Sequence, residues 1–153
     1  MNTKNKSSHL SALIITLLIM VFFPQSAHAL CMQPDEEGNW RNADQNTNSI
    51  PRIQLRFVCQ DQVHNGKPYP PGAPWYVHIY GKCVPTDCDW GEVAAERLDS
   101  RHIYAMYNPG FAKEYVYAKM SQYRSGQLWV YIWTDFTDPN RLDYASQDWF
   151  VRE

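Results

Sequence analysis

The segment of the chain with the most potential for chemistry covers residues 81–91 and reads GKCVPTDCDWG. Its two cysteines, Cys83 and Cys88, could form a redox couple, a metal site or a structural disulfide. Thiol oxidoreductases separate their cysteines by two residues, usually at the start of a helix, whereas this spacer has four residues and contains Pro85. The spacing therefore favours a structural disulfide, and Trp90 is expected to pack the loop onto the domain.

Acidic residues beside these cysteines are the other candidates for chemistry. Zinc sites are built from two Cys/His pairs at short spacings, and this segment holds one pair. Asp87, Asp89 and Glu92 could offer oxygen ligands to calcium, but they lack the regular spacing of a calcium loop. The same carboxyls could cleave a glycosidic bond only if two of them faced each other across a cleft. We therefore predict no metal ion, no cofactor and no catalytic residue, and favour a protein that is not an enzyme.

The beginning of the chain has the pattern of a secretory signal peptide. A basic start precedes an apolar run over residues 10–23, and Ala27-His28-Ala29 has the small-x-small pattern of a cleavage site. The run is shorter than the roughly 20 residues of a membrane-spanning helix, which disfavours an uncleaved anchor. We predict a signal peptide over residues 1–29, a single domain over 30–153 without a membrane span, and a periplasmic or extracellular location.

The cysteines support the same compartment, because all four lie after the predicted cleavage site. An even number of cysteines in a small exported chain is typical of disulfides, and four cysteines allow three pairings. We prefer Cys31 with Cys59, which would tie the N-terminus to the end of a strand. Cys83 would then pair with Cys88, since a four-residue spacer lets the two Cα atoms approach to disulfide distance.

The charge of the predicted mature domain limits its partners. All 16 acidic residues lie after residue 29, whereas two of the 14 basic residues lie before it, so the domain is acidic. A nucleic-acid partner would require a basic face, which excludes that class. The expected partner is an unknown small ligand, a glycan or another protein.

Most of the remaining sequence alternates between apolar and polar residues with a period of two, which indicates β-strands separated by turns. Strands are expected around Trp40, over 53–59, 75–80, 103–107, 113–122, 127–136 and 144–152, and near Glu92. Residues 92–99 could form a short helix or a strand, and residues 65–74 are expected to form a loop. About eight short antiparallel strands predict an all-β domain, either an up-and-down β-barrel of the lipocalin or avidin kind or a β-sandwich.

The strands 113–122 and 127–136 are expected to form a hairpin with the loop Arg124-Ser125-Gly126 and with Tyr123 facing Gln127. The paired residues then give the hairpin two different faces. The aliphatic face holds Val116, Ala118 and Met120 opposite Thr134, Ile132 and Val130. The other face is aromatic and polar, with Tyr117, Lys119 and Ser121 opposite Trp133, Tyr131 and Trp129.

Aromatic residues on one face of several strands are the candidate binding surface, because aromatic rings with a polar tip suit sugars, small amphipathic ligands and protein interfaces. The candidate ligand-binding residues are Tyr76, His78, Tyr80, Tyr115, Tyr117, Trp129, Tyr131 and Trp133. Alternatively, these residues line the barrel interior or cover its outside without a binding role.

Two resemblances bear on the fold. Gly38-Asn39-Trp40 and Arg152 resemble the Gly-x-Trp start and terminal Arg of lipocalin-like and avidin-like barrels, in which the Trp closes one end and the Arg packs across it. Most of the predicted mature chain resembles a family of small exported bacterial domains with a W-G-x-C-x-P-x-D-C-D-W-G motif. The resemblance is carried by residues 80–91 together with Gly38-x-Trp40-x-Asn42, Phe136-Thr137-Asp138 and Arg141-x-x-Tyr144. The chain departs from the family at Tyr80, where the family usually has Trp, and in an insertion over residues 65–74. The second resemblance implies a fold and an exported location, and no activity.

The leading hypothesis is an exported, non-enzymatic binding module that holds a small ligand or glycan through the aromatic face or the barrel mouth. The first alternative is a protein-interaction or envelope-structural domain that uses the same face. The second alternative is a hydrolase acting on envelope polymers, which would require Asp87, Asp89 and Glu92 to converge in a cleft.

Overall fold

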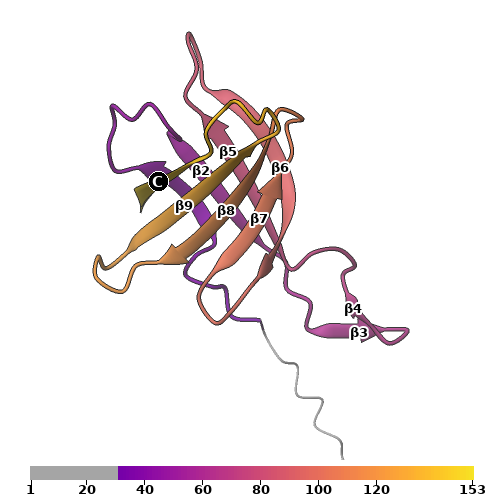
Figure 1. Cartoon of the computed structure of the whole chain (residues 1–153). Coiled ribbons are helices and arrows are strands. Elements are labelled where there is room, and N and C mark those ends of the chain that lie inside the picture. The colour runs from indigo at the N-terminus through magenta and orange to yellow at the C-terminus, as the bar shows by residue number, and fades with distance from the viewer. Residues whose placement is uncertain (1–30) are drawn as a thin grey trace, which may run out of the picture. The chain divides into compact units, whose positions relative to one another are not determined.

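The computed structural model describes residues 31–153, which form one compact unit, so the predicted signal peptide lies outside the described residues. This unit is an antiparallel barrel closed by eight strands (Figure 1). The strands of the chain are β1 (Gly38–Asn42), β2 (Arg52–Phe57), β3 (Gln62–His64), β4 (Lys67–Tyr69), β5 (Trp75–Gly81), β6 (Cys88–Arg97), β7 (Ile103–Tyr107), β8 (Ala112–Met120), β9 (Gln127–Phe136) and β10 (Tyr144–Arg152). Within residues 31–153 no helix is long and apolar enough to cross a membrane.

The topology is that of an up-and-down barrel, which confirms the predicted fold class. Neighbouring strands follow the order β1-β10-β9-β8-β7-β6-β5-β2, and β1 pairs with both β2 and β10 to close the ring. The sandwich alternative is therefore wrong. Residues 92–99, which could have formed a helix, lie mostly in strand β6.

A second, two-stranded sheet was not expected from the sequence. Strands β3 and β4 form a small hairpin that projects beside the barrel, in the chain between β2 and β5 (Figure 1). Asn65 and Gly66 form its turn, both with positive φ of 51° and 75°. An Asn-Gly pair is the preferred two-residue hairpin turn, so the signal was present inside the segment that was expected to be a loop.

The hairpin of β8 and β9 confirms the predicted faces but not the predicted register. Val116 pairs with Ile132 rather than Thr134, and Tyr117 pairs with Tyr131 rather than Trp133. Gly126 has a positive φ of 72° as expected, but the loop is longer, because Ser121 is the residue that bonds to Gln127 across its ends. A slip of two residues keeps every side chain on its own face, so the alternation could not detect it.

The aliphatic faces of the strands point into the barrel and form its core, whereas the aromatic faces point outward. The largest fully buried side chains are Trp40, Trp75, Phe150, Ile53, Leu55, Ile79, Ile103, Leu128, Val77, Val116 and Val130. An interior formed by eight strands is narrow enough for side chains to fill, and these buried side chains make up the core of the barrel.

The core is closed at one end, here called the base, by Trp40 and Arg152. The indole nitrogen of Trp40 donates to the carbonyl of Glu36 at 2.9 Å, and the guanidinium of Arg152 lies over the Trp40 ring. Gly38 makes room for this contact, because a Cβ there would collide with Nη1 of Arg152. The arrangement explains why a glycine, a tryptophan and an arginine occur together in this sequence.

Both predicted disulfides are present. Cys31 and Cys59, with Cα atoms 5.7 Å apart, tie the segment before β1 to the chain that leaves β2. Cys83 and Cys88, with Cα atoms 5.4 Å apart, close the loop between β5 and β6. The first bridge lies near the projecting hairpin, whereas the second stiffens the loop that contributes to the candidate site.

Candidate functional site

The end of the barrel opposite the base is here called the mouth. Four connections gather there, at the upper end of the barrel in Figure 1: the loops of residues 43–51, 82–87, 108–111 and 137–143. An up-and-down topology puts alternate connections at the same end, so the mouth combines segments that are far apart in the sequence.

A buried carboxyl group stands inside this mouth. Glu114 lies on β8, between Tyr107 on β7 and Thr134 on β9, in the row of inward-facing side chains. The residue is only 7% exposed, and no hydrogen-bond partner among the described residues reaches its Oε2 atom. Burial raises the pKa of Glu114, because the apolar surroundings disfavour the charged form. A buried polar group without a partner is unusual in a folded protein, so this carboxyl is a candidate for a role other than packing.

Tyr107, the neighbour of Glu114, reaches across from β7 to the backbone of the next two strands, β6 and β5. Its hydroxyl donates to the carbonyl of Val77 at 2.7 Å and lies 3.2 Å from the carbonyl of Gly91. Burial raises the pKa of Tyr107, so the hydroxyl stays a donor. Its proton is committed to these carbonyls and is therefore not the missing partner of Glu114.

Trp90 reaches the mouth because of an irregularity in β6. The register between β5 and β6 shifts between His78 and Tyr80, and Gly91 has a positive φ of 79°. Bulges of this kind redirect a side chain at the rim of a barrel. The indole of Trp90 then packs on Gly81, where a Cβ would lie 2.5 Å from its Nε1 atom.

Trp90 closes the mouth only in part. Its ring meets Tyr107 edge to face, with ring centres 5.8 Å apart, and 36% of its surface remains exposed. The sequence suggested that Trp90 packs the loop onto the barrel. The structure agrees with that packing and adds that the ring also forms the wall of an open space.

Two pockets meet at Glu114 and Trp90. Strand β6 pairs with β7 only through residues 95–97, near the base, so the two strands diverge toward the mouth. The larger pocket, of about 460 Å³, lies in this gap and is lined by Trp90, Tyr107, Phe111, Val93, Asp89 and Glu114 with residues 108 and 109. The smaller pocket, of about 280 Å³, borders Glu114 and Trp90 as well. Its lining also includes Ile132, Thr134, Tyr144, Ser146 and Lys82.

The charges around the larger pocket are acidic. Its lining includes two carboxyl groups, Asp89 and Glu114, and no basic side chain. Asp89 is held at the rim by His78 at 2.5 Å and by the backbone N–H of Gly91 at 2.7 Å, and these bonds lower its pKa. Lys82 lines only the smaller pocket, and its Nζ atom lies 4.0 Å from Asp87. Among residues 31–153, no basic side chain therefore lines the larger pocket beside Glu114.

The eight aromatic-face residues predicted from the sequence lie on the outside of the barrel, in two groups. The first group is Tyr76, His78 and Tyr80 on β5. His78 stacks on Tyr80 with ring centres 4.6 Å apart, and the guanidinium groups of Arg56 and Arg52 lie over Tyr76 and Tyr80. These rings are half-buried beneath cationic side chains, so they do not form an open aromatic surface.

The second group lies on β8 and β9 and consists of Tyr115, Tyr117, Trp129, Tyr131 and Trp133. Tyr117 contacts Tyr131, Trp129 stacks on Tyr131, and Lys119 lies over Trp129. Trp133 is 37% exposed, and the other four are half-buried. Strands β6 and β7 separate this group from the first, so the structure does not bring the eight residues to one point.

The three carboxyls considered for hydrolysis have different side chains as partners. Glu92 forms a two-pronged bond with Arg56, at 2.5 and 3.0 Å, which lowers the pKa of Glu92. Asp89 bonds to His78, and Asp87 lies 3.8 Å from Arg52. Of the three, only Asp89 lines either of the two pockets at the mouth, so they do not converge in one of them.

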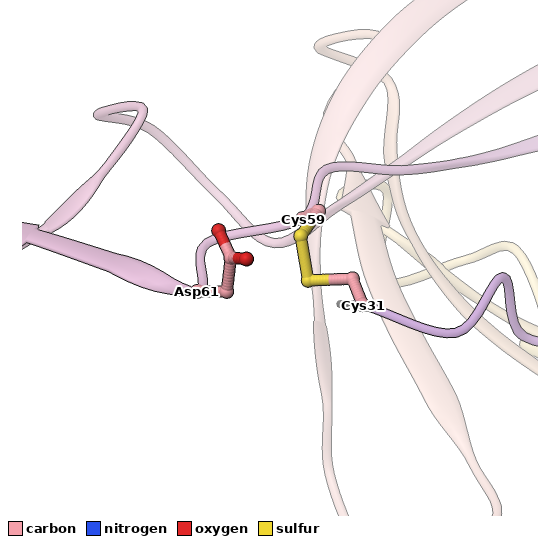
Figure 2. A group of neighbouring side chains, drawn as sticks. All are labelled: Cys31, Cys59 and Asp61. Atoms are coloured by element: carbon pink, nitrogen blue, oxygen red, sulfur yellow. A yellow bond between two sulfur atoms is a disulfide. The ribbon is translucent and has the colours of Figure 1, made fainter. Parts of the chain in front are cut away.

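A group of possible metal-binding atoms occurs at Cys31, Cys59 and Asp61 (Figure 2). Figure 2 shows the two sulfur atoms bonded to each other, with the Asp61 carboxylate beside them. Metal ions bind the thiolate form of cysteine, which a disulfide does not provide. One exposed carboxylate is left, which is not enough for a metal site.

Glu114 was not identified by the sequence reasoning, although a signal for it existed. It shares the alternation of Val116, Ala118 and Met120, the residues assigned to the aliphatic face. A carboxyl in such a row predicts a polar group inside the barrel. The openings on both sides of it depend on how strands β6 and β7 diverge, which the alternation does not encode.

Comparison of the chain with protein-family models, with curated proteins and with solved structures gives no match. The function is therefore inferred from the chemistry of the mouth.

Proposed function

We propose that the protein is an exported, non-enzymatic binding module that holds a small ligand in the mouth of its barrel. The observation that carries this proposal is the carboxyl of Glu114, which is buried, lacks a partner at Oε2 and borders both pockets. Ligand sites are typically concave, mostly apolar and equipped with a few polar groups that fix orientation. The mouth combines these properties.

The rest of the barrel supports this location. Trp40 and Arg152 close the base, so the mouth is the end through which a ligand would enter. Eight-stranded barrels leave room for one small ligand when side chains do not fill the interior completely. The larger pocket of about 460 Å³ lies within the usual range of small-molecule sites, roughly 300–1,000 Å³.

Export is supported by the chemistry of the cysteines. Disulfides persist in oxidising compartments and are rare in the cytosol, and both cysteine pairs of the described chain form them. The signal-peptide pattern of residues 1–29 points in the same direction.

The decisive experiment is mass spectrometry of small molecules that copurify with the protein isolated from its native host. We expect a bound molecule with the wild type and with a Trp129→Ala/Trp133→Ala variant, and its loss with Glu114→Gln. The double variant is the control for the outer aromatic face. Loss of the molecule from the double variant but not from Glu114→Gln would move the site to that face and contradict the proposal.

A second candidate function is docking of another protein on the outside of β7, β8 and β9. Met106, Tyr115 and Trp133 form one row across these strands, and Met106 and Trp133 are 45% and 37% exposed. Exposed apolar side chains that lie next to one another can form part of a protein interface. Light scattering of the purified protein, with fluorescence quenching of its tryptophans, would test whether a second copy covers this row.

A further inference from the structure

The lining of the larger pocket contains acidic side chains and no basic ones. The lining combines the aromatic side chains of Trp90, Tyr107 and Phe111 with the carboxyls of Glu114 and Asp89. The faces of aromatic rings attract cations, and carboxylates do so more strongly in surroundings of low dielectric. An anionic ligand would meet two carboxyl groups and no basic side chain in this lining, because His78, which bonds to Asp89, does not line the pocket.

From this lining we infer that the ligand of the mouth is a small organic cation, an ammonium or guanidinium group carried on an apolar body. The inference rests on the proposed function and specifies its ligand. The cationic group would pair with Glu114, and the apolar body would lie against Trp90 and Phe111, which are 36% and 56% exposed in the structure. A bound cation would supply the partner that Oε2 of Glu114 lacks.

Other ligands satisfy this pocket less well. A divalent metal such as calcium takes six to eight oxygen ligands, whereas the buried part of the pocket offers one carboxyl among aromatic rings. A neutral sugar could bond to a carboxyl, but it carries no positive charge for the two carboxyl groups of this lining to attract. Lys82, the basic residue that lines the smaller pocket beside Glu114, has its Nζ atom 4.0 Å from the Asp87 carboxylate.

Three probes with the same ring and different charges test the inference: benzylammonium, benzyl alcohol and benzoate. Each is titrated at pH 8 into the folded wild-type domain, and binding is followed by tryptophan fluorescence and by calorimetry. We expect benzylammonium to bind at least tenfold more tightly than the other two. A Trp90→Phe variant identifies the fluorescence change that comes from the mouth.

Glu114→Gln is the matching change in the protein, because it keeps the shape of the side chain and removes its charge. It should weaken benzylammonium at least tenfold and leave benzyl alcohol unchanged. The control is Glu96→Gln, which removes an equal charge from an exposed position on β6 outside the larger pocket. Glu96→Gln should bind benzylammonium like the wild type, and circular dichroism should show both variants folded.

The outcomes separate this inference from the proposed function. If benzyl alcohol or benzoate binds beside Trp90 as tightly as benzylammonium or more tightly, the inference of a cationic ligand is wrong. The mouth would still be a ligand site. Unchanged benzylammonium binding by Glu114→Gln would overturn the role of Glu114. If none of the probes binds at millimolar concentration, the cation inference fails, and the copurification experiment decides separately whether the mouth holds any ligand.

Discussion

The guanidinium carbon of Arg152 lies 4.4 Å from the centre of the Trp40 ring, at the end of the barrel opposite the mouth. The same guanidinium donates to the backbone carbonyls of Glu37 at 2.6 Å and Asp35 at 2.5 Å. One side chain thus covers the base and holds the segment before β1 against it. This contact joins the last strand to the first and completes the closure of the ring.

Replacing Arg152 with methionine should therefore destabilise the barrel. The change removes the cation–π contact and two hydrogen bonds to backbone, which together are worth about 1–2 kcal/mol at a partly exposed site. Urea unfolding followed by fluorescence would measure the loss. Arg41→Met is the control, because Arg41 is an exposed arginine on β1. Equal stability of the two variants would contradict the role given to Arg152.

The hydrogen bond between Tyr107 and Val77 gives a second prediction. Tyr107→Phe keeps the ring that packs against Trp90 but leaves a buried carbonyl without its donor. We expect a loss of about 1–2 kcal/mol in the free energy of unfolding. Tyr123→Phe, at a position 93% exposed, should cost nothing measurable in the same denaturant series.

Glu114 predicts a dependence of stability on pH. Its pKa in the folded state is raised by burial, so between the unfolded pKa of about 4.3 and the folded value the native state binds more protons than the unfolded state. Stability contributed by the protonated carboxyl is fully present below that window and is lost as the pH rises through it. Glu114→Gln does not titrate and escapes this loss.

The measurement is thermal unfolding of the ligand-free wild type and of Glu114→Gln from pH 4 to pH 8. The variant should be more stable at pH 8 by about 1 kcal/mol, the scale of one buried polar group, and the difference should shrink toward pH 4. A difference that stays constant with pH would show that the carboxyl is not the cause.

The two disulfides should contribute unequally to stability. Their cysteines are separated by 28 and 5 residues, and a disulfide that closes a longer loop restricts the unfolded chain more. Replacing Cys31 and Cys59 by serine should cost about 3–4 kcal/mol, and replacing Cys83 and Cys88 about 2 kcal/mol. Urea midpoints of the two double variants provide the comparison, and the reverse order would contradict it.

The fold class could be predicted because it depends on patterns that are local in the sequence. Alternation along the chain assigns each side chain to a face, and the compartment and spacing of the cysteines favour the two bridges that are present. The register between β8 and β9 could not be predicted from the sequence, because a slip of two residues preserves the alternation. The hairpin loop is longer than expected, and the side chain of Ser121 stabilises it by accepting from the N–H groups of Tyr123 and Arg124.

The sequence by itself determined that the barrel would have one aliphatic and one aromatic face, and that Glu114 would share the aliphatic one. The tertiary structure decided which face is inside, because closing the sheet puts the apolar side chains into the interior and spreads the outer aromatics over separated strands. The tertiary structure also decided where the pockets of the mouth lie. The bulge at Trp90 and the divergence of β6 from β7 arise from long-range strand pairing, and they turn a carboxyl in an apolar row into the centre of a candidate site.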